Sequence, residues 1–148
     1  MRIYMDVCCL NRPYDDLSQD RNYLEAEAVL SIISHCEHGE WILVASGVIE
    51  HELTKITDAD RLEQVQELYS TAKERIALTE PAEKRSAFFQ QNGIKPFDSL
   101  HLAVAENAGV DVFLTTDDAL LRKAQQMDLN IKVANPVSWL MEVLNYER

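Results

Sequence analysis

Four acidic residues stand at places in the sequence where carboxylates can act together. Asp6 and Asp117 each follow a short apolar run, Glu52 lies among apolar residues, and Asp98 opens an apolar helical stretch. Acids that end two strands of one parallel sheet meet at the same edge of that sheet. Carboxylates gathered there repel one another, and a hard divalent cation with oxygen ligands, Mg²⁺ or Mn²⁺, removes the repulsion.

Each of these acids also has a purely structural explanation when it is considered alone. Asp6 fits a turn, Asp98 fits the positive end of a helix dipole, and Asp117 fits a helix N-cap. Glu52 fits a solvated helix surface. Only their joint placement favours a shared cation site, and the absence of His and Cys from these four positions argues against zinc.

The composition indicates one globular domain without a basic surface. The 148 residues are 47% apolar and 26% charged, which is ordinary for a single domain, here 1–148. Fourteen Lys and Arg against 25 Asp and Glu give a formal net charge of −11, which excludes a basic footprint over the whole surface. No apolar run is long enough to span a bilayer, and Asp6 interrupts any signal-peptide core. Three cysteines without a C-x-x-C pair predict no disulfide framework. We therefore expect a cytoplasmic protein.

Short apolar runs alternate with amphipathic stretches along the chain, which predicts βα repeats, a mostly parallel sheet and the α/β fold class. Ser46, Asp58 or Asp60, Thr79 and Asn135 are candidate helix N-caps. Strands are predicted at 2–5, 41–45, 75–78, 112–115 and 131–133. Helices are predicted at 21–37, 46–55, 58–69, 79–93, 97–108, from 116 or 117 onward, and at 136–144.

The segments around the four acids resemble PIN-domain nucleases and, within that family, the VapC-like toxins of bacterial toxin–antitoxin pairs. These segments are IYMDVCCLNRP, SGVIEHEL, KPFDSLHLAVAENAG and DVFLTTDDALL. Their order and spacing on a βα pattern carry the resemblance, which covers nearly the whole chain. The resemblance implies a three-layer α/β/α fold and hydrolysis of RNA phosphodiester bonds with Mg²⁺ or Mn²⁺. It also implies an antitoxin partner and a homodimer.

The resemblance assigns a role to each acid. Asp6, Asp98 and Asp117 match metal ligands, and Glu52 matches either a ligand or the group that positions the attacking water. Arg12 follows Asp6 by six residues in a predicted loop. Its side chain either contacts the phosphate or is a solvated loop arginine.

Two of these assignments have a competitor close by in the sequence. Glu50 competes with Glu52, and the Glu-Leu pair that Glu52 begins favours Glu52. Asp118 competes with Asp117, and the spacing from Thr115 favours Asp117. Thr115 or Thr116 is a candidate hydrogen-bond partner of Asp117, or part of a helix cap.

Other polar residues receive structural interpretations. The family often has Ser, Thr or Asn two residues after the first Asp, whereas this chain has Cys8, a weaker hydrogen-bond partner. His101 follows Asp98 by nearly one turn, so it either approaches the site or, as we expect, is a partly buried structural histidine. The cluster 35–38, His-Cys-Glu-His, is expected to be a core Cys36 flanked by surface histidines.

Tyr23, Leu24 and the stripe of Val65, Leu68 and Tyr69 are candidate dimer faces, unless they belong to the core. The alternative to a nuclease is a PIN-fold module that binds RNA or protein without cleavage. The neighbouring reading frame distinguishes the two functions, because a small antitoxin gene upstream would favour the nuclease toxin.

Overall fold

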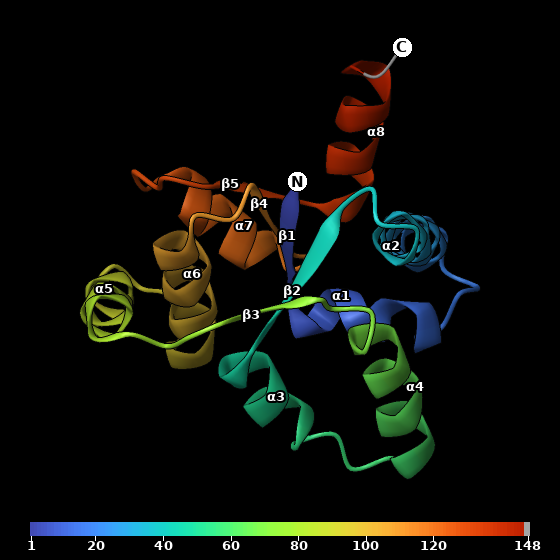
Figure 1. Cartoon of the computed structure of the whole chain (residues 1–148), viewed down its shortest axis with the longest axis horizontal. Helices are drawn as coiled ribbons and strands as arrows, with labels where there is room; N and C mark the ends of the chain where they lie inside the picture. The colour runs from blue at the N-terminus through green and yellow to red at the C-terminus, as the bar shows by residue number, and fades with distance from the viewer. Residues whose placement is uncertain (147–148) are drawn as a thin grey trace.

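The computed structural model describes residues 1–146, and a five-stranded sheet runs through its middle (Figure 1). Every strand pair is parallel, and the strand order is β3-β2-β1-β4-β5. The prediction of a mostly parallel central sheet is therefore confirmed. The strands are β1 (Arg2–Met5), β2 (Ile42–Ser46), β3 (Glu74–Ile76), β4 (Val112–Leu114) and β5 (Lys132–Ala134).

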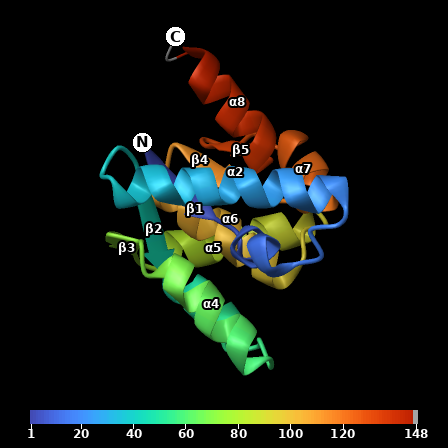
Figure 2. The same ribbon diagram turned by 90° about the vertical axis from the view of Figure 1, so that its right-hand side faces the viewer.

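Helices cover both faces of the sheet, which gives the three α/β/α layers. Figure 1 shows α5 and α6 on one side and α2 on the other, and Figure 2 shows α2 lying across its face of the sheet. Among the described residues, no helix has both the length and the apolar character to cross a membrane. The helical segments are α1 (Val7–Asn11), the 3₁₀ turn η1 (Arg12–Tyr14), α2 (Asp20–Glu37), α3 (Gly47–Leu53), α4 (Ala59–Tyr69), α5 (Glu80–Gln91), α6 (Pro96–Ala108), α7 (Asp118–Gln125) and α8 (Pro136–Tyr146).

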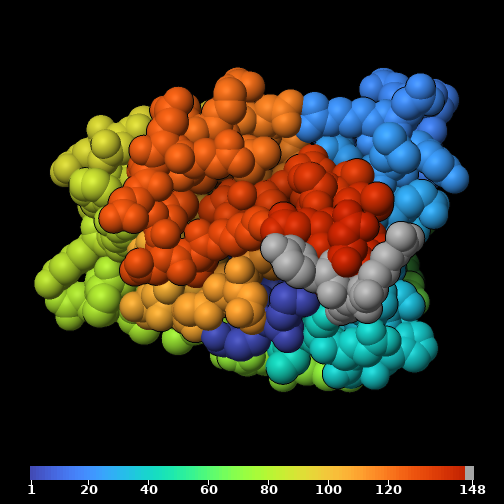
Figure 3. Space-filling model, turned by 90° about the horizontal axis from the view of Figure 1, so that it is seen from above, coloured from blue at the N-terminus to red at the C-terminus, as the bar shows by residue number. Residues whose placement is uncertain are grey.

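The two central strands are the most deeply buried part of the core. Tyr4 in β1 and Phe113 in β4 are fully buried, and their rings stack with centroids 5.2 Å apart. A parallel sheet covered on both faces needs apolar residues at successive positions, as the sequence of β1 and β4 shows. Seen from above in Figure 3, the orange and red segments from α7 to α8 form much of the surface.

The sequence predicts most helices and strands to within a few residues, but it predicts a loop after Asp6 where the structure has a helix. The segment begins with Val-Cys-Cys-Leu, whose residues have mixed helix propensity, so the local signal is weak. Burial of Val7, Cys9 and Leu10 against the core stabilises α1 instead. Arg12 consequently lies in η1 rather than in an open loop.

Candidate active site

The carboxyl ends of β1 and β4 lie side by side and bring two of the predicted acids to one edge of the sheet. Met5 pairs with Leu114 in the parallel register, and the Asp6 N–H donates to the Leu114 carbonyl at 2.9 Å. Asp117 follows the end of β4 by three residues and is the N-cap of α7. In Figure 1 this edge lies at the lower end of β1, beside α1 and α3.

Asp6 is buried, with 5% of its surface exposed, and its carboxylate is held in one orientation. Its Oδ2 accepts a hydrogen bond from Thr115 Oγ1 at 3.0 Å and one from Cys8 Sγ at 3.4 Å. Thr115 Oγ1 also accepts from the Asp117 N–H at 3.1 Å. The thiol that stands in place of the family's usual hydroxyl or amide therefore still contacts Asp6, and Thr115 supplies the stronger donor.

Glu52 joins Asp6 through α3. Ser46 ends β2 and caps α3, because its Oγ accepts the Ile49 N–H at 3.1 Å. This cap sets the start of the helix, and Glu52 lies in its last turn. One ligand atom each of Asp6, Glu52 and His101 lie within 4.8 Å of one another.

His101 lies beside the site, although the structural interpretation is the one that the sequence favours. The side chain is fully buried, and its Nε2 lies 3.2 Å from Glu52 Oε1. The ring is thus more deeply buried than the partly buried structural histidine that the sequence predicts, and it also contacts Glu52. The available signal was the spacing from Asp98, since residues three apart share a helix face.

Glu50 faces away from this acidic group. It forms an ion pair with Arg75 and accepts a hydrogen bond from the Tyr69 hydroxyl at 2.8 Å. The Arg75 guanidinium accordingly holds the pKa of Glu50 below its usual range. Of the two glutamates that compete in the sequence, the structure therefore places Glu52 with Asp6.

Asp98 and Asp117 lie next to the group of Asp6, Glu52 and His101 rather than within it. Together they line a cavity of about 70 Å³, with Ile94, Lys95, Ala119, Leu120 and Lys123 as the other lining residues. Asp117 Oδ1 caps α7 by accepting from the N–H groups of Ala119 and Leu120 at 2.9 and 3.2 Å. Asp118 instead binds Arg21 through both oxygens, at 2.7 and 2.8 Å.

The charges of these acids act on one another. Burial raises the pKa of Asp6 well above its ordinary value, and the negative charges of Glu52 and Asp98 raise it further. Burial also raises the pKa of Asp98, and the charge of Asp117 adds to the effect. Carboxylates that repel in this way form a site for a hard cation with oxygen ligands.

Arg12 makes internal ion pairs. Its Nε lies 3.0 Å from Glu25 Oε1, and its Nη1 lies 3.0 Å from Asp15 Oδ2. Glu25 is 1% exposed, so Arg12 compensates a buried charge. These contacts favour a structural role for Arg12 over phosphate binding.

Residues 14–126 match the family model described as the PIN domain. A chain of VapBC2 from Rickettsia felis, solved bound to a DNA fragment from their promoter, superposes with a TM-score of 0.59 at 12% identity, covering 91% of this chain and 98% of that chain. PAE2754 from Pyrobaculum aerophilum superposes with a TM-score of 0.56 at 17% identity, covering 99% and 90%. No curated protein matches the sequence significantly. Because the family model spans most of its length, the chain belongs to the PIN domain family.

Proposed function

We propose that the protein is an endoribonuclease that hydrolyses RNA phosphodiester bonds with Mg²⁺ or Mn²⁺, and that it is the toxin of a toxin–antitoxin pair. The observation that carries the proposal is the meeting of Asp6 and Glu52, whose oxygen atoms lie within 4.8 Å at the carboxyl edge of the sheet. Oxygen donors at this spacing suit a hard divalent cation. Membership of the PIN domain family supports the nuclease, and the fold shared with a chain of VapBC2 supports the toxin.

The four acids would have different roles in the proposed reaction. A bound divalent cation supplies charge neutralisation at the phosphoryl oxygen and a water of lowered pKa. Asp6, Asp98 and Asp117 would hold it, Asp6 through Oδ1, because Oδ2 accepts both of its hydrogen bonds. Glu52 would either complete the ligand set or orient the attacking water.

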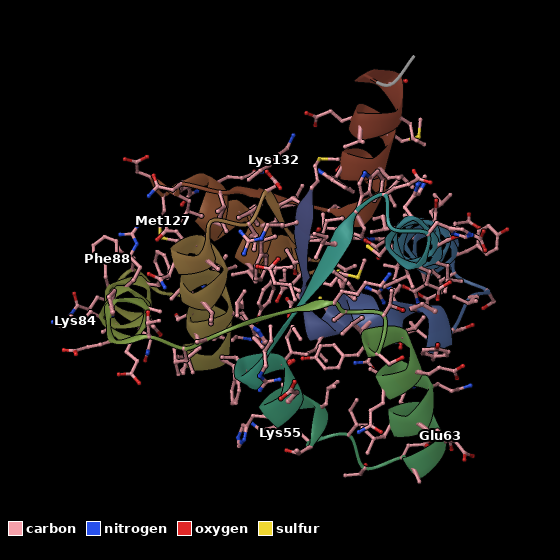
Figure 4. The ribbon with its side chains drawn as sticks, viewed as in Figure 1. Lys55, Glu63, Lys84, Phe88, Met127 and Lys132 are labelled. Atoms are coloured by element: carbon pink, nitrogen blue, oxygen red, sulfur yellow. The ribbon has the colours of Figure 1, made fainter. Side chains whose placement is uncertain are left out.

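The protein has a net negative charge, so contacts to RNA would have to come from individual basic residues near the acids. Two lysines, Lys55 and Lys95, are candidates. Lys55 follows α3 and lies at the lower end of the molecule in Figure 4, with its Nζ 4.0 Å above the Phe97 ring. Lys95 lines the same small cavity as Asp98 and Asp117. We propose that these two lysines contact the RNA backbone near the scissile phosphate, because Arg12 is engaged with Glu25 and Asp15.

The first test is cleavage of single-stranded or loop-containing RNA by the purified protein. We expect cleavage with Mg²⁺ or Mn²⁺, none in excess EDTA, and recovery when the metal is restored. Glu52→Gln is expected to lose most of the activity, whereas Glu50→Gln, the matched control, retains it, because Glu50 pairs with Arg75. Cleavage that persists in EDTA would refute metal dependence. Metal-saturated protein that binds RNA without cutting it would establish the alternative, a binding module.

We further propose an antitoxin partner and a homodimer. Tyr23 and Leu24 are 50% and 55% exposed on α2, and Met141 is 56% exposed on α8, which packs against α2. The other candidate face belongs to the core, since Val65 is buried and Tyr69 is half-buried with its hydroxyl bonded inside the molecule. The cytoplasmic location remains a prediction of the sequence.

Light scattering is expected to give twice the mass of the chain. Leu24→Asp is expected to give a monomer, because it places a charge on the exposed apolar surface of α2. Lys84→Asp on α5 is the control, since Lys84 lies on the other side of the sheet (Figure 4). A wild-type protein that remains monomeric at every accessible concentration would end the dimer proposal.

A further inference from the structure

Five residues form a chain of hydrogen bonds that begins and ends on α3 and is buried except at Glu52. The Ile49 N–H donates to Ser46 Oγ at 3.1 Å, and Ser46 Oγ lies 2.9 Å from the Tyr4 hydroxyl. That hydroxyl lies 2.6 Å from His101 Nδ1, and His101 Nε2 lies 3.2 Å from Glu52 Oε1. Ser46, Tyr4 and His101 are all 0% exposed. The chain thereby connects β2, β1 and α6 to the helix that carries Glu52.

The direction of these hydrogen bonds follows from Ser46. Its Oγ already accepts the Ile49 amide hydrogen, and within residues 1–146 the one acceptor for its own hydrogen is the Tyr4 oxygen. Tyr4 must then donate its hydrogen to His101 Nδ1. The reverse direction would leave the buried Ser46 hydroxyl hydrogen without an acceptor, which carries a desolvation penalty.

The tautomer of His101 follows in turn. A neutral imidazole whose Nδ1 accepts a hydrogen bond carries its hydrogen on Nε2. Nε2 is therefore the donor to Glu52 Oε1, and every polar hydrogen in the chain has an acceptor. An Nε2 that carries a hydrogen has no lone pair to offer a cation.

We propose that His101 is a positioning residue that holds Glu52 by donating from Nε2, and that it is not a metal ligand. The inference rests on the proposed function, since it concerns the orientation of a carboxylate in the proposed cation site. The closeness of Asp6, Glu52 and His101 would also suit a site with three ligands. The direction of the hydrogen-bond chain decides between these two roles.

The fold explains why Glu52 needs such a partner. The helix α3 has seven residues, which is too short to be stable without tertiary contacts, and Glu52 is its second-last residue. Its side chain is 25% exposed. Anchoring Oε1 on a buried ring restricts the carboxylate to one orientation and leaves Oε2 for the cation or the water.

NMR of the metal-free protein with ¹⁵N-labelled histidines tests the tautomer directly, at about pH 8, above the ordinary histidine pKa. We expect a hydrogen on Nε2 of His101 and none on Nδ1, with the signals assigned by their loss in His101→Gln. Tyr4→Phe keeps the packed ring but removes the donor to Nδ1, so the Nε2 hydrogen should be less strongly favoured, with Glu52 as its remaining partner. Tyr69→Phe is the control, because Tyr69 contacts the Ser46 backbone from outside the chain. A wild-type His101 with its hydrogen on Nδ1 would overturn the proposal.

Calorimetric Mg²⁺ titration tests the consequence for the site. We expect Tyr4→Phe to weaken Mg²⁺ binding by about tenfold, the lower end of the effect of losing an outer partner of a ligand. Tyr69→Phe should change it less than about twofold, and the Nε2 hydrogen should persist at saturating Mg²⁺. Loss of that hydrogen on adding Mg²⁺ would make His101 a ligand and overturn the proposal. A wild-type protein that binds neither Mg²⁺ nor Mn²⁺ would refute the proposed function, while the metal-free tautomer still decides how His101 contacts Glu52.

Discussion

Replacing Asp6 by asparagine is expected to lower RNA cleavage at saturating Mg²⁺ by about 100-fold or more. A ligand charge in a metal site contributes several kcal/mol of transition-state charge stabilisation. Asparagine has the shape of aspartate, and its side-chain oxygen can still accept from Thr115 and Cys8. The loss would therefore report the missing charge rather than a changed fold, and kcat/KM measured on one RNA would quantify it.

Asp118→Asn is the matched control for this variant. Asp118 binds Arg21 and lies outside the acidic group, although it is adjacent to Asp117 in the sequence. We expect its activity to stay within about twofold, since an exposed ion pair contributes little. Equal losses in the two variants would show that general acidity, and not the site, supports cleavage.

Asp98→Asn is expected to stabilise the metal-free protein by about 1 kcal/mol, because it removes one charge from a group of repelling carboxylates. Mg²⁺ binds the folded state and should raise the melting temperature of the wild type more than that of the variant. The expected stability change is opposite if Asp98 only stabilises the N-terminus of α6 through the helix dipole. The variant would then be destabilised by a few tenths to ~1 kcal/mol, with an unchanged response to Mg²⁺.

The same repulsion sets a pH dependence for the metal-free protein. The pKa values of Asp6 and Asp98 are raised in the folded state, so the native protein binds more protons than the unfolded chain. Stability should fall as pH rises from about 4, the ordinary carboxyl value, through the raised pKa values. Denaturation in EDTA across this range should show a shallower decline for Asp98→Asn. A wild type whose stability rises with pH over this window would contradict the account.

Periodic and local patterns predict most of this fold from the sequence. The apolar runs of β1 and β4 show burial on both faces, and Ser46 and Thr79 are visible as caps before amphipathic stretches. Cys36 is buried on the apolar face of α2, as predicted. The short helix α1 escapes prediction because contacts with the distant core, and not its own propensities, stabilise it.

The candidate site is predictable only where a local pattern in the sequence shows a residue's place in the fold. Strand ends identify Asp6 and Asp117, since parallel strands share an edge. The contact of His101 with Tyr4 spans 97 residues and leaves no local pattern. Arg12 is similar, because its partner Glu25 lies on the next long helix and the sequence alone does not show that this acid is buried.

Anomalous diffraction from crystals soaked in Mn²⁺ tests the central claim most directly. We predict a peak at the carboxyl edge of the sheet, about 2.1 Å from carboxylate oxygens of Asp6 and of at least one of Glu52, Asp98 and Asp117. The peak should be absent from the same crystal form of Asp6→Asn. Mn²⁺ peaks confined to other acids, in crystals of protein that cleaves RNA in solution, would contradict the assignment of this acidic group as the metal site.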